Sequence, residues 1–135
     1  MNIAIRYYSK LGHTKDIAEA IGEELGVPAI SVVDEPELTE GVDLLFLGGA
    51  PYANVMEKEL REYAKRLNAE KVKRVVLFTT SNWSRRTVRS LRKILAGNGI
   101  EVHPDYFYAH MLNIPRRVPE AKKFARTIVD GLSAS

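Results

Sequence analysis

Apolar runs and amphipathic patterns alternate along this chain, and that alternation constrains its fold more than any other feature. Apolar runs predict strands at about residues 2–8, 29–33, 43–47, 74–79 and 100–103. Apolar residues at helical spacing predict helices at about 13–25, 56–67, 84–96 and 119–132. Strands that alternate with helices form an open parallel sheet with right-handed crossovers. We expect one doubly wound, five-stranded α/β domain over residues 1–135, with helices on both faces.

Three segments carry more specific expectations. The acidic connection 34–41 is too short for a crossover helix, and we expect a single helical turn near residues 37–40. Pro104 interrupts the last strand or confines it to an edge, and residues 105–117 are expected to be irregular or partly extended. Arg6 lies in an apolar strand, where a cation needs a partner, and we expect an ion pair or a place near the site.

Composition excludes several classes of protein. With 135 residues, 45% hydrophobic and 27% charged, the chain is typical of a globular domain with a proper core. The absence of cysteine excludes disulfides and thiol chemistry. No apolar run is long enough to span a membrane, and Met1 leads directly into the first strand, so we expect a cytoplasmic protein. His13, His103 and His110 are scattered, and no metal site is expected.

The net charge of +3 conceals an asymmetry between the two halves of the chain. Residues 1–70 contain 7 basic and 13 acidic side chains, whereas residues 71–135 contain 13 basic and 4 acidic ones. Such a distribution produces an oriented surface field. The basic residues cluster at Arg85, Arg86, Arg89, Arg92 and Lys93, and again at Arg116 and Arg117. This cluster forms either a solvated helix face or a docking surface for an acidic partner; nucleic acid is not an expected partner.

The stretch Tyr7-Tyr8-Ser9-Lys10-Leu11-Gly12-His13-Thr14 joins the first strand to the first helix. Unpaired backbone N–H groups and the positive end of the helix dipole meet there, which favours binding of an anion such as phosphate. Ser9 and Thr14 add hydroxyl groups, and Gly12 allows close approach of the backbone. An ordinary helix N-cap is the alternative interpretation.

Two further polar loops follow buried strands. Gly48-Gly49-Ala50-Pro51-Tyr52-Ala53-Asn54 follows the strand at 43–47, and Thr80-Ser81-Asn82-Trp83-Ser84 follows the strand at 74–79. All three loops lie at the carboxyl edge of a parallel sheet, where ligands bind at the reversal of strand order. Each later loop offers one aromatic ring, Tyr52 or Trp83, for stacking or for packing at the loop base.

These three loops together resemble the flavodoxin family over essentially the whole chain. Residues 9–14 resemble its signature for the phosphate of flavin mononucleotide (FMN), [ST]-x-[ST]-G-x-T. The resemblance implies sheet order 2-1-3-4-5, with the phosphate on residues 9–14 and the flavin ring between the two later loops. The implied FMN-binding residues are Ser9, Lys10, Leu11, Gly12, His13, Thr14, Pro51, Tyr52, Ala53, Asn54, Thr80, Ser81, Asn82 and Trp83.

The chain also differs from the family pattern. Leu11 stands where the signature has a second hydroxyl, and no glycine follows Gly49 at the place where family members flip a peptide. The strand-five insertion of long-chain flavodoxins is absent, so the chain resembles the short form. Flavodoxins are acidic around the flavin, whereas Arg85 and Arg86 follow the third loop here, which predicts a raised flavin potential.

The resemblance implies an FMN-dependent electron carrier that performs no bond-making chemistry and works between a reductase and an acceptor enzyme. Acidic partners would dock on Arg85, Arg86 and Arg89. The alternatives are an FMN-dependent NAD(P)H:quinone or flavin reductase, and a flavodoxin-like module that has lost FMN. A receiver domain would need an Asp where Gly48 and Gly49 stand.

Overall fold

The computed structural model describes residues 1–52, 55–81 and 84–133. Its main sheet is parallel and five-stranded, in the order β2-β1-β3-β6-β7. The strands are β1 (Ile3–Tyr7), β2 (Ala29–Ser31), β3 (Val42–Gly49), β6 (Val72–Ser81) and β7 (Glu101–His110). Counted along the chain, the sheet strands have the order 2-1-3-4-5, so the predicted topology is confirmed.

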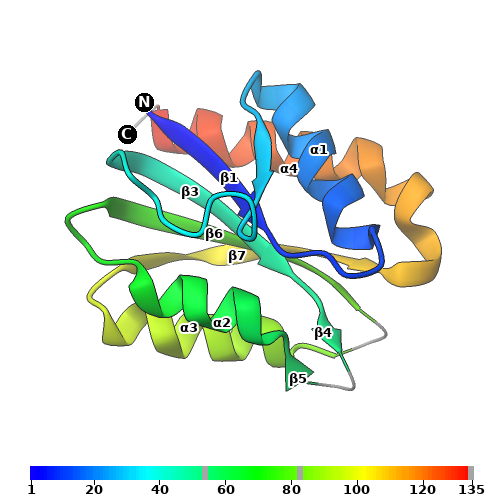
Figure 1. Ribbon diagram of the computed structural model, residues 1–135. Coiled ribbons are helices and arrows are strands. Elements are labelled where there is room, and N and C mark those ends of the chain that lie inside the picture. Colours follow the sequence, from blue (N-terminus) through cyan, green and yellow to red (C-terminus); the bar gives the residue numbers. More distant parts are fainter. Residues whose placement is uncertain (53–54, 82–83, 134–135) are drawn as a thin grey trace.

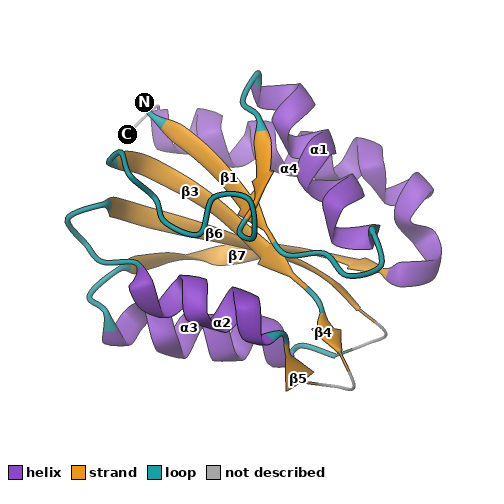
Figure 2. Cartoon of the chain, in the orientation of Figure 1, coloured by secondary structure: helices purple, strands orange, loops and turns teal. Residues whose placement is uncertain are grey.

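Helices cover both faces of this sheet. α1 (His13–Leu25) and α4 (Ile114–Ser133) lie side by side on one face, and α2 (Lys58–Arg66) and α3 (Arg86–Gly97) lie on the other (Figures 1 and 2). Each helix comes after a strand of the sheet along the chain, with the hairpin β4–β5 between β3 and α2, so the helix N-termini gather near the carboxyl edge. Within the described residues, no helix is long and apolar enough to cross a membrane.

The strands bury side chains on both faces because helices cover both faces. Ile5 and Phe46 belong to the core formed with α1 and α4. Leu45, Leu47 and Leu77 belong to the opposite core, formed with α2 and α3. The strands therefore read as continuous apolar runs rather than as alternating patterns.

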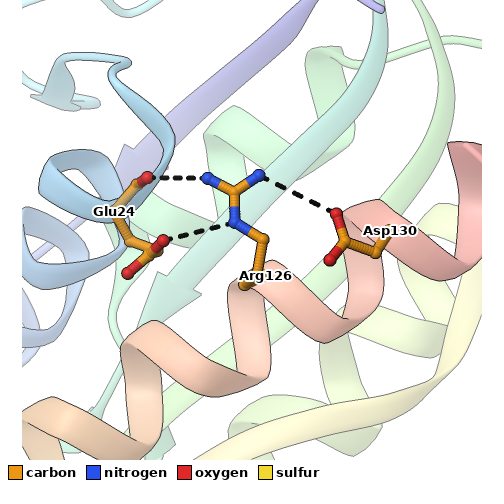
Figure 3. Close-up of polar contacts among 3 residues, drawn as sticks. All are labelled: Glu24, Arg126 and Asp130. Carbon is orange, nitrogen blue, oxygen red and sulfur yellow. Dashed lines mark hydrogen bonds and ion pairs between the residues drawn. The ribbon is translucent and has the colours of Figure 1, made fainter.

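Arg126 of α4 ties its helix to the end of α1 (Figure 3). Its Nε lies 3.2 Å from Glu24 Oε2, and its Nη2 donates to the Glu24 carbonyl at 2.9 Å. Its Nη1 lies 3.8 Å from Asp130 Oδ1 on its own helix. The last turn of α1 has no basic residue of its own, so α4 supplies the cation that the negative end of that helix dipole favours.

Residues 32–41 contain no helical turn at 37–40, so that expectation is wrong; the chain turns at 32–34 instead. Arg6 Nη2 donates to Glu35 Oε2 at 2.9 Å, which confirms the expected ion pair of Arg6. Arg66 donates to the Pro36 carbonyl at 3.1 Å. These long-range bonds from β1 and α2 hold the connection in place without a local helix.

A small antiparallel hairpin, β4 (Pro51–Tyr52) and β5 (Val55–Met56), separates β3 from α2. The helix therefore begins at Lys58 and not at Met56. Met56 is buried against the same core as Leu60, which lies on the inward face of α2. The buried side chain of Met56 therefore continues the apolar spacing of the helix, although its backbone belongs to strand β5.

Of the two expectations for residues 105–117, the extended one is confirmed over 105–110, and the irregular one is wrong. β7 continues through Pro104 to His110, a 3-10 turn η1 (Met111–Asn113) follows, and α4 begins at Ile114 with Pro119 inside it. β7 is an edge strand, where the missing N–H of proline breaks no ladder. The pairing of β7 with β6 shifts its register between Val75 and Leu77, so the strand resumes beyond the proline. The remaining predicted boundaries lie within two residues of the observed ones.

Candidate functional site

A cavity lies at the carboxyl edge of the sheet, where the loops after β1, β3 and β6 meet. Its lining comes from segments that are far apart in the sequence. The lining residues are Tyr8, Ser9, Lys10, Leu11, His13, Thr14, Ala50, Pro51, Glu57, Thr80 and Met111. The site therefore combines the predicted anion loop with parts of the two later loops.

The loop that joins β1 to α1 is shaped as an anion cradle. Gly12 has a left-handed backbone with φ 92°, which a residue with a side chain rarely adopts. Ser9 Oγ accepts the Gly12 N–H at 3.0 Å, and this bond closes the loop. α1 begins directly afterwards at His13, and its first residues, His13 and Thr14, line the cavity. The backbone N–H groups of this first turn have no partner within the helix and are therefore free to bind an anion.

Thr14 and Thr80 connect the first loop to the third. Their Oγ1 atoms lie 2.7 Å apart, and both residues are almost completely buried. One hydroxyl donates to the other, so the pair retains one hydroxyl proton. Both residues line the cavity, and that proton is available to an acceptor on a ligand.

Glu57 is a functional candidate that the sequence interpretation missed. It stands at the N-cap of α2 but makes no side-chain capping bond. Its Oε1 is buried and has no hydrogen-bond partner among the described residues. A buried acceptor without a partner is costly, so the cavity suits a ligand that brings a donor. The sequence signal was the acidic residue after the second loop, at the start of a helix.

Tyr7 stands at the end of β1, directly before the cradle. Burial raises the pKa of its hydroxyl, and the negative charges of Glu19 and Asp34 raise it further. The ordinary value is already 10.0, so Tyr7 is neutral at physiological pH and adds no negative charge beside the cradle.

The structure brings together most of the predicted site residues that it describes. Ser9, Lys10, Leu11, His13, Thr14, Pro51 and Thr80 line the cavity, and Gly12 shapes the first loop. Ser81 is buried beside the cavity, and its hydroxyl donates to the Ser84 carbonyl. Tyr52 belongs to β4, whereas the predictions for Ala53, Asn54, Asn82 and Trp83 fall outside the described residues. Tyr8, Ala50 and Met111 are lining residues that were not predicted.

The strand order of the sheet and the loop at residues 9–14 together define this chain as a doubly wound α/β protein. The chain runs from β1 outward to β2 and then returns to β3 on the other side of β1, so strand order reverses beside the cavity. This is the place where doubly wound proteins bind phosphate-bearing ligands. The family model described as flavodoxin domain matches residues 4–113, which is most of the chain. The chain belongs to the flavodoxin family.

Solved structures share the fold at low sequence identity. Oxidised flavodoxin 1 from Bacillus cereus is 15% identical, with a TM-score of 0.79 over 96% of this chain and 98% of that one. A variant of Fusobacterium nucleatum flavodoxin bound to flavin mononucleotide is 19% identical, with a TM-score of 0.70 over 94% of both chains. Rubredoxin oxygen:oxidoreductase from Desulfovibrio gigas is 20% identical, with a TM-score of 0.75 over 98% of this chain but 36% of that one. The comparison with curated proteins gave no match.

Proposed function

We propose that residues 1–135 act as one flavodoxin-like domain that binds FMN and carries electrons between a reductase and an acceptor enzyme. Membership in the flavodoxin family supports FMN as the cofactor. The cavity at the reversal of strand order, with the cradle of residues 9–14 as part of its wall, is the observation that carries the proposal. When bound, the flavin accepts and releases electrons.

The residues of the cavity fit both chemical ends of FMN. The backbone N–H groups in the first turn of α1 can donate to a phosphate dianion, and Gly12, which has no side chain, allows the phosphate to come close. The remaining proton of the Thr14–Thr80 pair suits a phosphate oxygen. The unpartnered oxygen of Glu57 suits an N–H donor, which the flavin ring carries and the phosphate does not. We therefore assign the phosphate to residues 9–14.

The ring is proposed to lie between residues 51–54 and 80–83, with Tyr52 and Trp83 against its faces. Flat aromatic contacts contribute about 0.5–1.5 kcal/mol each beyond the buried area. This part of the proposal rests on the family pattern and on Pro51 and Thr80, which line the cavity at the carboxyl edge.

Acidic redox partners are proposed to dock on α3. Arg86 and Arg89 are exposed there and follow the third loop. Arg85, the third predicted docking residue, holds its guanidinium against the ring of Tyr108 and contributes less free surface. The cytoplasm remains the predicted location, which cell fractionation tests.

Titration of the purified protein with FMN, followed by stepwise reduction, tests the proposal. We expect quenching of FMN fluorescence at a 1:1 ratio and slow reduction of the bound flavin by NAD(P)H alone. Rapid reduction after a flavodoxin reductase is added supports the carrier. Rapid reduction by NAD(P)H alone supports the alternative, a quinone or flavin reductase. A chain that binds no FMN is a flavodoxin-like module without the cofactor.

A threonine pair provides the site-directed test. Thr14→Val removes the bond to Thr80 and the hydroxyl next to the cradle, so FMN affinity should fall about tenfold. Thr87→Val is the matched control, because Thr87 is equally buried in α3 and its hydroxyl has no partner among the described residues. Equal FMN affinities of the two variants, measured by fluorescence quenching, would remove Thr14 from the site.

A further inference from the structure

We propose that Arg85, rather than the exposed Arg86 or Arg89, sets the reduction potential of the bound flavin by holding an uncompensated positive charge next to the third loop. This inference rests on the proposed function. It concerns a residue that does not line the cavity and that acts through its charge.

Arg85 is held in place by aromatic side chains of β7. It is the N-cap residue of α3, four positions after Ser81. Its Cζ lies 3.5 Å from the ring centroid of Tyr108 and 5.9 Å from that of Tyr106. Its Nη1 is buried and has no hydrogen-bond partner within the described part of the chain. The guanidinium is therefore held against aromatic rings.

Several other arginines form ion pairs with carboxylates. Arg6 pairs with Glu35, and Arg117 pairs with Glu120. Among the described residues, no carboxylate forms an ion pair with Arg85. A stack on an aromatic face stabilises a cation without neutralising it. The first turn of α3 also has no acidic residue, so the positive end of its dipole adds to the charge of Arg85.

The same stack is connected to the third loop. The Tyr108 hydroxyl donates to the Ser81 carbonyl at 3.2 Å, and the Ser81 hydroxyl donates to the Ser84 carbonyl at 2.8 Å. Ser81 ends β6, and Ser84 directly precedes Arg85. These bonds fix the charge of Arg85 relative to both ends of the loop that we assign to the flavin ring.

Reduction of the flavin changes its charge. Two electrons from the reductase and one proton from solvent convert the neutral oxidised ring into an anionic reduced ring. A fixed cation nearby stabilises the reduced form more than the oxidised form, which raises the reduction potential. Arg86 and Arg89 are exposed to solvent, where salt and water screen their charges. Because Nη1 of Arg85 is buried, its charge is screened less, and Arg85 should raise the reduction potential more than Arg86 or Arg89 does.

The test compares the affinities of the apoprotein for oxidised and for reduced FMN, because their ratio sets the shift in potential on binding. Arg85→Gln should lower the relative affinity for reduced FMN by about threefold to tenfold. For a two-electron couple, tenfold corresponds to a fall of about 30 mV, which spectroelectrochemistry measures directly. Arg85→Lys keeps the charge and should retain most of the ratio. Arg89→Gln, the matched control on the same helix, should change the ratio by less than about twofold.

Each outcome bears on the proposal. An Arg85→Gln ratio equal to that of Arg89→Gln overturns it. A loss in Arg85→Lys as large as in Arg85→Gln also overturns it, since the geometry of the stack and not its charge would then be responsible. Thermal unfolding of each apoprotein verifies that the variants are folded. If the wild-type chain binds no FMN, the proposed function fails; if it binds FMN and only the ratio is unaffected by Arg85→Gln, this inference alone fails.

Discussion

At the scale of single residues, Leu11 marks the main difference between this chain and the FMN phosphate signature. It lines the cavity, and it is 68% exposed. An exposed leucine in a polar loop gains little from burial and cannot donate from its side chain. Its backbone N–H remains next to Gly12, so the cradle keeps its main-chain donors.

Leu11→Thr restores the hydroxyl of the signature. We expect FMN affinity to rise about tenfold, since a hydrogen bond to a charged group contributes about 1.5–3 kcal/mol and exposure reduces this. Leu112→Thr is the control, because Leu112 is even more exposed in η1 and does not line the cavity. Fluorescence titration measures both, and an unchanged affinity in Leu11→Thr would mean that the phosphate does not reach this position.

At the scale of secondary structure elements, the last residues of β3, Gly48 and Gly49, pack closely against β6 and α2. A Cβ at Gly48 would lie 2.2 Å from Cε2 of Phe78 on β6, which is fully buried. A Cβ at Gly49 would lie 2.3 Å from Leu60 Cδ2 of α2. The two glycines thus allow the aromatic side chain and the helix to pack against the last residues of the strand.

Gly48→Ala should lower the free energy of unfolding by about 1–3 kcal/mol, because the Phe78 ring has to leave its packed position. Gly97→Ala in α3 is the matched control: no heavy atom lies within 4 Å of its added Cβ, and alanine favours the helix. Urea unfolding followed by circular dichroism measures both. A double variant with Phe78→Leu should recover part of the loss; if Gly48→Ala alone is neutral, the close packing of these strands is refuted.

Elements also show where local patterns mislead. Pro104 left open whether the last strand is interrupted or confined to an edge, and β7 is an edge strand that continues past the proline with a shift in register. The beginning of α4 was placed at Pro119, whereas Ile114 is buried against the core and Arg117 donates to the Tyr108 carbonyl at 2.7 Å. These tertiary contacts extend the helix by five residues.

At the scale of the whole molecule, the acidic first half and basic second half of the chain are folded into one sheet. The exposed Arg86 and Arg89 of α3 follow the third loop, and we propose that this positive surface is the one that a redox partner approaches. A positive surface of this kind speeds encounters with anions, and the effect decreases with salt.

The rate at which the reduced, FMN-loaded protein is oxidised by ferricyanide should therefore fall as ionic strength rises. A double variant, Arg86→Gln with Arg89→Gln, should lower the rate several-fold at low salt and flatten its salt dependence. Lys65→Gln with Lys123→Gln removes the same charge from exposed sites on α2 and α4. Equal slopes in the two double variants, measured by stopped flow, would contradict a docking role for α3.

The sequence predicted the order of the elements and an anion-binding loop at residues 9–14, and its resemblance to flavodoxins implied the sheet order. Buried runs, helix periodicity, and Ser9, Gly12 and Thr14 are local signals, and right-handed crossovers leave few ways to connect them. Tertiary structure alone decided which distant groups meet. The Thr14–Thr80 bond, the unpartnered oxygen of Glu57 and the stack of Arg85 on Tyr108 each depend on neighbouring loops and strands that the register of the sheet aligns. No local pattern encodes such pairs, because their energies arise only when burial removes the groups from water.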